Sequence, residues 1–371
     1  MSKLEELILQ YCPDGVEYKP LGDILSVNRG RRLTKSQLSD DGKYYVYHGS
    51  KDTPLGKYVE FNVKGNTTIV VNTGGIGGVK FCENDFWCSD GSFWIGHSNR
   101  MNDKFVYYYL SPLESYFASQ KRVGGVPTID RSVVENVEIP VPPLPVQEEI
   151  VKILDKFSLL SAELEAELEG RRKQFDFYRN QLLSFDSGSD SVVWKKLGDF
   201  CEIKTGSKPE KIMSYSTRYE YINAGTTNSG YTKIANSDGN AVTTPSRGQG
   251  GIGYVGYQRN PFWLGPLCYR ITSKSPLLIT RFLYHFLNCH NELILKLKNT
   301  GGAPALNRQD LVEILIPIPS LSEQQRIVDI LDRFDTLTND LASGLPAEIE
   351  KRKKQYEHYR DKLLTFKRKE A

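Results

Sequence analysis

The sequence predicts an α+β fold arranged as an internal pseudo-two-fold repeat, with two similar mixed α/β domains that are each followed by a long helix. The length of 371 residues exceeds what one hydrophobic core usually organises, so at least two domains are expected. A Pro-rich run that changes abruptly into helical spacing occurs at residues 139–157 and again at residues 316–334. Shorter motifs return in the same order, for example Phe86-Trp87 as Phe262-Trp263. This pattern is typical of a chain that folds as two like halves.

The expected boundaries follow the repeat. Residues 1–143 form the first globular domain with an N-terminal helix, residues 144–186 the first long helix, residues 187–320 the second globular domain, and residues 321–371 the second long helix. Short β-branched and aromatic runs between Gly and Asn turns predict strands in both globular parts. The small polar segment 186–191 suits a linker.

Each long helix is expected to begin at the Pro-rich run. Proline favours extended backbone before it and cannot donate to a neighbouring strand, so the run predicts a stiff extended entry to the helix. In the second copy, Ser322 and Gln325 have the spacing of a capping box, in which each side chain satisfies a backbone N–H at the helix start.

The first long helix carries an apolar stripe at heptad spacing. Eight of its ten stripe positions between Leu154 and Phe185 are apolar, which is typical of a coiled coil over five heptads. At ~1.5 Å per residue, a helix from Val146 to Phe185 would span roughly 60 Å. A helix of this length needs a partner for its stripe.

The second long helix supplies a similar stripe with a change of register. It holds four extra residues around Ser343 to Pro346 relative to the first copy. Four extra residues form a stutter in a coiled coil, and proline disrupts a helix interior. We therefore expect a break near residues 343–346 in the second helix and a continuous first helix.

Composition limits the class of protein. Six cysteines without C-x-x-C spacing and an N-terminus without an apolar signal segment predict reduced thiols in a cytoplasmic protein. No apolar run reaches the ~18 residues that a membrane span requires. The net charge of +3 does not by itself indicate nucleic-acid binding. Residues 351–370 contain nine Lys or Arg against three acidic residues, which suits a solvated helix face or contact with phosphates or an acidic partner.

Catalytic and metal motifs are incomplete. Residues 248–253 satisfy G-x-G-x-x-G, but no acidic residue follows at the distance that a ribose would require. The segment 260–263 lacks the second proline of a methyltransferase loop, and 202–204 has only the E-x-K ending of a nuclease motif. His285, Cys289 and His290 have no second pair of ligands, so core and surface roles are expected for them. None of these motifs completes a catalytic site or a metal site, so the sequence predicts neither.

A segment without acidic residues marks candidate nucleic-acid contacts. No Asp or Glu occurs from residue 239 to 291, which fits either a partly buried sheet with solvated arginines or a face that meets phosphates and base edges. Shorter basic stretches occur at equivalent places in both halves. The candidate DNA-binding residues are Arg29, Arg31, Arg32, Lys35, Tyr45, His48, Thr73, Lys121 and Arg122 in the first half, and Lys204, Ser207, Lys208, Asn223, Ser246, Arg247, Gln249, Lys298, Asn299 and Arg308 in the second.

The duplicated Ile-Pro-x-Pro, Leu, Gln, Ile-Val-x-Ile-Leu-Asp-x-Phe module resembles the specificity (S) subunit of type I restriction-modification systems. The resemblance covers the whole chain and implies two target recognition domains, each reading half of a bipartite double-stranded DNA target, with the helices packed as an antiparallel coiled coil. It also implies that the helix starts dock two modification subunits, for which Gln147, Ile150, Gln324 and Ile327 are the candidates.

The resemblance places the chemistry on other subunits. Modification subunits would bring S-adenosylmethionine, and restriction subunits, whose presence the sequence leaves open, would bring ATP and Mg²⁺. Two alternatives remain at this stage: a free-standing DNA methyltransferase or nuclease with an unrecognised active site, and the recognition subunit of a methylation-only or type II-like system.

A tandem repeat inside the first long helix suggests a ruler. Residues 161–164 and 165–168 read Ser-Ala-Glu-Leu and Glu-Ala-Glu-Leu. One such unit adds roughly 6 Å of helix, which corresponds to about two base steps of ~3.4 Å. The helix length is therefore expected to set the distance between the two half-sites.

Overall fold

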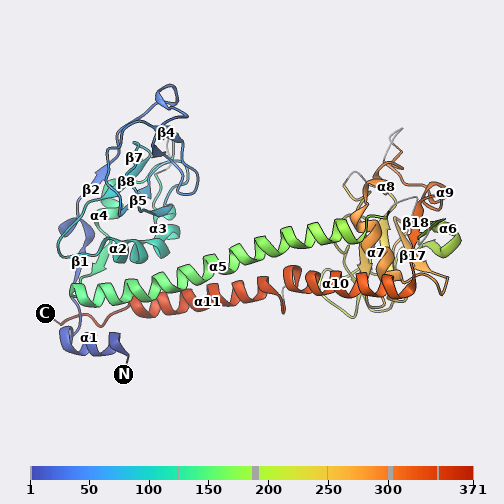
Figure 1. The fold of residues 1–371 in the computed structure, drawn as a ribbon. Helices are drawn as coiled ribbons and strands as arrows, with labels where there is room; N and C mark the ends of the chain where they lie inside the picture. The colour runs from blue at the N-terminus through green and yellow to red at the C-terminus, as the bar shows by residue number, and fades with distance from the viewer. Residues whose placement is uncertain are drawn as a thin grey trace. The chain divides into compact units, whose positions relative to one another are not determined.

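The computed structural model describes residues 2–122, 125–185, 192–248, 250–299, 304–340 and 342–370. The chain forms two compact units, the first of residues 1–164 with 349–371 and the second of residues 165–348. Helix α5 (Leu144–Leu182) belongs to both units (Figure 1). The expected linker at residues 186–191 lies outside the described residues.

The globular part of the first unit contains a four-stranded sheet of order β2-β8-β5-β6 and a three-stranded sheet of order β4-β3-β7. The strands are β2 (Val27–Arg29), β3 (Tyr44–Tyr47), β4 (Gly56–Tyr58), β5 (Thr67–Val71), β6 (Val79–Cys82), β7 (Trp87–Cys88) and β8 (Ser92–Ile95). The helices are α1 (Lys3–Tyr11), α2 (Asp103–Leu110), α3 (Glu114–Ser119) and α4 (Arg131–Glu135), with 3₁₀ turns at Leu21–Asp23, Lys35–Gln37 and Ser111–Leu113.

The second unit repeats this topology with the orders β11-β17-β14-β15 and β13-β12-β16. Its strands are β11 (Cys201–Thr205), β12 (Tyr219–Ile222), β13 (Tyr231–Thr232), β14 (Ala241–Pro245), β15 (Gly256–Gln258), β16 (Trp263–Leu264) and β17 (Cys268–Ser273). Its helices are α6 (Leu197–Phe200), α7 (Thr280–Cys289), α8 (Glu292–Leu295), α9 (Arg308–Leu311) and α10 (Leu321–Asn339). The α+β repeat expected from the sequence is confirmed.

The core of each unit lies between the larger sheet and one helix. Every residue of β5 and of β14 is buried. Phe105 on α2 and Phe282 on α7 are almost fully buried and occupy equivalent places in the repeat. At about 25 cal/mol per Å² of apolar surface removed from water, such phenylalanines are among the largest single contributions to each core.

The Pro-rich runs form short two-stranded ladders. β9 (Glu138–Pro140) pairs with β1 (Tyr18–Pro20), and β18 (Leu315–Ile318) pairs with β10 (Val193–Lys196), both antiparallel. Proline fits such ladders because a strand with a single partner leaves one side without backbone hydrogen bonds. The predicted capping box is wrong: Ser320 is the N-cap of α10 and accepts from the Glu323 N–H at 3.3 Å, so Ser322 already lies inside the helix.

The repeated pattern of hydrogen bonds at the helix starts centres on one glutamine in each unit. Gln147 Oε1 accepts from the Asn102 N–H at 2.8 Å, and its Nε2 donates to the carbonyls of Arg100 and Pro142 at 3.0 and 2.6 Å. Gln324 repeats this arrangement with the Ile279 N–H at 2.8 Å and the carbonyls of Leu277 and Pro319 at 2.8 and 2.9 Å. Each glutamine thus joins its long helix to the loop before α2 or α7.

This role corrects the choice of docking residues. Gln147, Ile150, Gln324 and Ile327 are fully buried within the chain, so their side chains offer no surface to a partner. The sequence motif marks the joint between domain and helix. Leu144 and Leu321, which are neighbours at the helix starts, are exposed.

The aspartate of the Ile-Leu-Asp-x-Phe motif makes a second joint. Asp155 pairs with Lys104 at 3.0 Å and accepts from the Tyr108 hydroxyl at 2.5 Å, both on α2. Its counterpart Asp332 pairs with Arg281 at 2.8 Å and lies 2.7 Å from Nε2 of His285, both on α7. The two joints therefore share one arrangement, with Lys104 and Tyr108 in the first replaced by Arg281 and His285 in the second.

Replacing His285 with tyrosine should reduce the pH dependence of stability. Burial lowers the pKa of His285 below its usual 6.5, so the folded chain keeps the ring neutral. Below about pH 6.5 the unfolded chain binds a proton that the folded chain does not, and the free energy of unfolding falls as the pH falls. Tyrosine retains a donor to Asp332, as in the first unit.

Urea midpoints of both proteins at pH 7.5, 6.5 and 5.5 would check this expectation. The four other histidines are present in both proteins, so the difference between them isolates His285. Equal slopes in parent and variant would contradict the assignment.

The long helices pack along the predicted apolar stripes, and the position of Pro346 differs from the prediction. In the first unit α5 packs along α11 (Leu345–Leu364), where the rings of Phe157 and Tyr359 stack with centroids 5.4 Å apart. In the second unit the end of α5 packs along α10 and runs antiparallel to it (Figure 1). The ring centroids of Phe175 and Phe334 are 6.1 Å apart. α10 ends at Asn339 and α11 begins at Leu345.

Pro346 occupies the first turn of α11, where a missing N–H costs nothing. The proline thus starts a helix after the break. Within the described residues, no helix has the length and apolar character that crossing a bilayer demands.

Candidate nucleic-acid interface

Loops of the first unit converge on the segment 89–91 between β7 and β8. Arg29 Nε donates to the Asp90 carbonyl at 3.2 Å, and the Asn72 amide donates to the same oxygen at 3.4 Å. His48 Nδ1 accepts from the Gly91 N–H at 3.2 Å and lies 3.4 Å from an Asp90 carboxylate oxygen. Arg29 and His48, which are distant in sequence, therefore meet around Asp90.

The Gly-rich loop after β5 lies beside the basic loop that contains Lys121 and Arg122. Thr73 forms an antiparallel bridge with Thr128, and its hydroxyl donates to the Pro127 carbonyl at 3.2 Å. Arg122 bridges the same Thr128 and forms an ion pair with Asp130. Arg122 and the adjacent Lys121 are exposed, so this double bridge presents basic side chains beside Thr73.

The second unit builds the same junction from other residues. Arg247 stands in the place of Thr73 and bridges Ala305, and Asn299 stands in the place of Arg122 and bridges the same residue. Asn223 Oδ1 accepts from the Leu267 N–H at 2.9 Å, and the Ser246 N–H donates to the Leu267 carbonyl at 2.9 Å. Arg247 and Asn299 are exposed, whereas Ser246 is buried and cannot reach a ligand directly. Gln249 lies outside the described residues.

The basic loops after β2 and β11 are each fixed by a tryptophan. The indole N–H of Trp87 donates to the Arg31 carbonyl at 2.8 Å, and that of Trp263 donates to the Ser207 carbonyl at 2.8 Å. A Cβ on Gly30 would lie 2.2 Å from the Ser89 carbonyl oxygen, so only glycine permits this close approach.

The side chains of these two loops face solvent: Arg31, Arg32, Lys35, Lys204, Ser207 and Lys208 are all exposed. Lys204 is paired with Glu202 at 2.7 Å. Both phenylalanines and Trp87 are buried, whereas Trp263 is half-buried, and each tryptophan also holds a loop through its indole N–H. In the sequence, Phe-Trp recurs together with Gly30 in the first half and Gly206 in the second. This recurrence is the pattern from which the two loop contacts could have been predicted.

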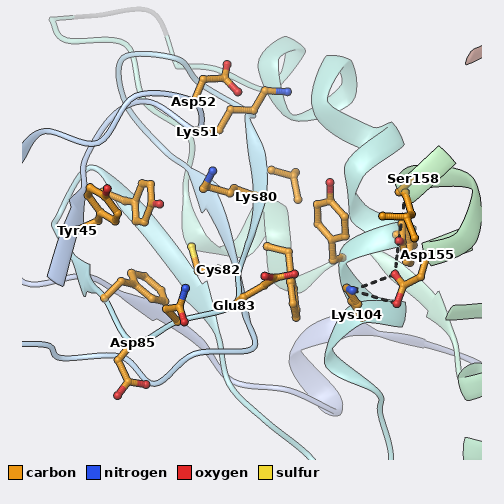
Figure 2. Close-up of a pocket in the computed structure, with 18 residues that line it drawn as sticks. Tyr45, Lys51, Asp52, Lys80, Cys82, Glu83, Asp85, Lys104, Asp155 and Ser158 are labelled. Carbon is orange, nitrogen blue, oxygen red and sulfur yellow. Dashed lines mark hydrogen bonds and ion pairs between the residues drawn. The ribbon is translucent and has the colours of Figure 1, made fainter. Parts of the chain in front are cut away.

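Two of the remaining candidates, Tyr45 and Arg308, lie apart from these junctions. Tyr45 on β3 stacks beside Lys57 and lines a pocket of about 780 Å³ with Lys80 and Glu83 (Figure 2). Arg308 begins α9 and lines a different pocket with Glu202. Lys298 is half-buried next to Asn299. The fold therefore does not bring Tyr45 and Arg308 to the junctions.

The pocket in Figure 2 has the character of an ion-pair network. Lys51 Nζ lies 2.7 Å from both carboxylate oxygens of Glu114, and this hydrogen bond raises the pKa of Lys51. The labelled Lys104 reaches Asp155, which belongs to the joint described above. Acidic and basic side chains alternate among the described residues of its wall, and none of these residues is a nucleophile that an adjacent base activates.

The thiols are unsuited to nucleophilic catalysis. Burial raises the pKa of all six cysteines, to about 12 for Cys82, Cys201 and Cys268. In the described ranges, no group of three or more His, Cys, Asp or Glu is arranged to hold a metal ion. His285 is engaged by Asp332, and His290 Nε2 lies 3.0 Å from the Leu183 carbonyl.

Comparison with known proteins agrees with the repeated fold. The family model described as type I restriction modification DNA specificity domain matches residues 13–170 and 190–351. The type I restriction enzyme EcoR124I/EcoR124II specificity subunit of Escherichia coli is 36% identical over 99% of this chain and 97% of its own length. A putative type I specificity subunit of Haemophilus influenzae is 28% identical over 95% of this chain and 96% of its own length.

Solved structures show the same fold. The S subunit of the type I restriction-modification system from M. genitalium aligns with a TM-score of 0.65 at 21% identity, covering 94% of this chain and 95% of that one. A chain from a study of complex assembly and conformational transition in a type I system aligns with a TM-score of 0.55 at 19% identity, covering 94% and 97%. Both matches span the complete repeat. The chain therefore belongs to the family of type I restriction-modification specificity subunits, which recognise DNA sequence and are not themselves catalytic.

Proposed function

We propose that each globular domain reads one half of a bipartite DNA target through its junction of loops. The observation that carries this proposal is that the two junctions have one backbone arrangement but different polar side chains. Thr73 and Arg122 in the first unit correspond to Arg247 and Asn299 in the second. Reading two different half-sites requires the same backbone arrangement in both domains with different polar side chains.

The chemistry of these side chains suits base edges. An arginine can donate two hydrogen bonds to guanine O6 and N7, and an asparagine can pair with adenine N6 and N7. Arg247 and Asn299 are the residues for which we propose these contacts. Thr73 and Arg122 are their counterparts in the first domain, where His48 is a further candidate. Lys121, Lys298 and Asn223 flank these positions and would support them.

The loops held by tryptophan suit the phosphate backbone. Arg29 and Lys204 lie at the ends of strands β2 and β11, and the exposed loops that follow carry Arg31, Arg32, Lys35, Ser207 and Lys208. Cationic contacts to phosphate position a protein without reading sequence. We retain Tyr45 and Arg308 only as peripheral contacts, and Ser246 as a backbone support for Arg247.

The partners follow from membership of the family. We propose that two modification subunits dock at the helix starts and that restriction subunits join them, with S-adenosylmethionine, ATP and Mg²⁺ bound by those subunits. Leu144 and Leu321 are exposed at the first residue of α5 and of α10, where an apolar side chain favours a protein contact. A cytoplasmic location would bring the assembly to chromosomal DNA.

Replacing Arg247 with alanine should relax one half-site only. The complex of the variant with its modification subunits should lose about 1–3 kcal/mol of discrimination at one base pair of the half-site read by the second domain. The half-site read by the first domain should be unchanged. The measurement is a map of methylated adenines in host DNA, and Arg122→Ala is the matched variant for the other half-site.

The result has two contrary outcomes. Relaxation of both half-sites by Arg247→Ala would disprove the assignment of one domain to each half. Methyl transfer from labelled S-adenosylmethionine by the purified chain without partners would instead revive a free-standing enzyme.

Removing Arg31 and Arg32 together should weaken binding to all sequences alike. If both arginines bind phosphates, the slope of log K against log salt should become shallower by about 0.9 for each phosphate that is no longer neutralised. Fluorescence anisotropy of the complex with a labelled duplex, measured at several salt concentrations, gives this slope. A variant with unchanged slope and altered methylation sequence would place these arginines on bases.

A further inference from the structure

Asp90 places a carboxylate where the basic loops of the first unit meet. The residue lies between β7 and β8, and its side chain is 28% exposed. Arg29 reaches the backbone carbonyl of Asp90. The carboxylate itself accepts from the Ser89 hydroxyl at 3.2 Å and lies 3.4 Å from His48 Nδ1. Among the described residues, no lysine or arginine forms an ion pair with this carboxylate.

The second unit holds the same turn without a carboxylate. The repeat aligns Asp90 with Pro266. The next residue, Gly91 in the first unit and Leu267 in the second, accepts through its carbonyl from the loop after β5 or β14 at 3.0 and 2.9 Å. Because a proline side chain forms no hydrogen bond, the turn does not require the carboxylate for its fold. Asp90 is therefore expected to act on something outside the chain.

His48 presents a donor beside this carboxylate. Its ring rests on Gly91, where an added Cβ would lie 2.7 Å from Nδ1, so a larger residue would displace the imidazole. All contacts of the ring with described polar groups involve Nδ1, which accepts from the Gly91 N–H at 3.2 Å. A neutral imidazole that accepts at Nδ1 carries its proton on Nε2. An acceptor on Asp90 and a donor on His48 thus lie next to each other.

We propose that Asp90 selects cytosine in the half-site read by the first domain, by accepting a hydrogen bond from the cytosine N4 amino group. His48 Nε2 donates to the guanine of the same base pair. In the major groove, cytosine shows this amino group and guanine shows the acceptors O6 and N7. Adenine also has an amino group, but its N7 acceptor lies beside that group and repels a carboxylate. This inference rests on the proposed reading of one half-site by each domain and adds the base to it.

The charge of Asp90 makes the selection strict. The exposed neighbours Arg29, Lys121 and Arg122 are cationic and attract the phosphates of any sequence. A carboxylate that DNA covers loses its hydration, and the loss is compensated only where a donor meets it. Thymine and guanine show only acceptors or a methyl group in the major groove. Asp90 therefore lowers the affinity for wrong bases as well as favouring cytosine.

Two substitutions of Asp90 test the inference in the full chain assembled with its modification subunits. Asp90→Asn keeps an oxygen toward Ser89 and adds an amide donor, a combination that matches N6 and N7 of adenine. Asp90→Ala removes the acceptor altogether. Asp41→Asn removes the same charge from the exposed turn before β3 and is the control. The measurement is a map of methylated sites in host DNA.

One C·G pair of the first half-site should respond. Asp90→Asn should change its cytosine to adenine, and Asp90→Ala should open the position to every base, whereas Asp41→Asn should change nothing. The second half-site should stay the same in all variants. Binding of labelled duplexes gives a direct measure, with pyrimidin-2-one, which lacks the amino group, in place of that cytosine. This exchange should weaken binding of the parent complex about five- to 150-fold more than binding of the Asp90→Ala complex.

Unchanged half-sites in both Asp90 variants, or equal effects of pyrimidin-2-one on parent and Asp90→Ala, would overturn the inference. A first half-site without a C·G pair would do the same. Loss of methylation at every sequence in both variants, with Asp41→Asn active, would overturn it by assigning Asp90 to the fold.

Arg122→Ala separates this inference from the proposed function. If Arg122→Ala alters the first half-site and the Asp90 variants do not, the selection of cytosine by Asp90 is wrong and the reading of that half-site by the first domain stands. If none of these variants alters the first half-site, both are wrong.

Discussion

Replacing Gln324 with leucine should destabilise the second unit by about 3 kcal/mol or more. The substitution removes the side-chain partner of three backbone groups, namely the Ile279 N–H and the carbonyls of Leu277 and Pro319. Each buried group that is left without a hydrogen bond costs about 1–3 kcal/mol. Leucine has a similar size, so the loss reports the hydrogen bonds rather than a cavity.

Hydrogen exchange gives the sharpest measurement of this effect. The Ile279 amide donates to the glutamine side chain, so its protection should fall together with that of the start of α7. Gln147→Leu should do the same to the Asn102 amide in the first unit. Gln325→Leu is the control, because Gln325 is exposed and donates to Asp329 on its own helix at 2.8 Å. Equal losses for Gln324→Leu and Gln325→Leu would refute the joint.

Deleting residues 165–168 should change the target itself. α5 is continuous from Leu144 to Leu182, so removal of four residues shortens it by roughly 6 Å, or about two base steps. We expect methylation of the original target to be lost and a target with a spacer shorter by one or two base pairs to be methylated. Both half-sites should keep their sequence, because the deletion lies outside the recognition loops.

Sequencing of methylated host DNA with the deleted and the intact gene gives both spacers. Substituting residues 165–168 with four alanines keeps the helix length and should leave the spacer unchanged. A deletion strain with the original spacer would show that the helix is not a ruler. Loss of methylation in the alanine variant would point to the side chains instead.

The joints show how a correct motif can receive the wrong role. The sequence repeats Gln147 as Gln324, and the resemblance suggested a docking surface. Hydrogen bonds to the loops before α2 and α7 decide otherwise, and those loops lie over forty residues earlier in the chain. No local pattern reports a partner at that separation. A buried polar side chain must be satisfied, so the fold could retain glutamine there only by bringing backbone groups to it.

The cap and the break illustrate a smaller error of the same kind. Ser320 and Ser322 both precede a helical pattern, and spacing to Gln325 favoured the second. Backbone conformation selects Ser320, whose extended φ and ψ follow the strand β18. Pro346 was expected at the break and instead lies in the first turn of α11, because proline is tolerated where no intrahelical donor is needed.

The sequence by itself determined the repeat, the two helical stripes, the interruption of the second long helix and the resemblance to specificity subunits. These depend on periodicity and on duplicated motifs, which are local properties of a chain. Only the tertiary structure decided which polar residues meet: Arg29 with His48, Arg247 with Asn299, and each tryptophan with its basic loop. Such meetings depend on strand order and on loops that cross between sheets, and no spacing along the chain encodes them.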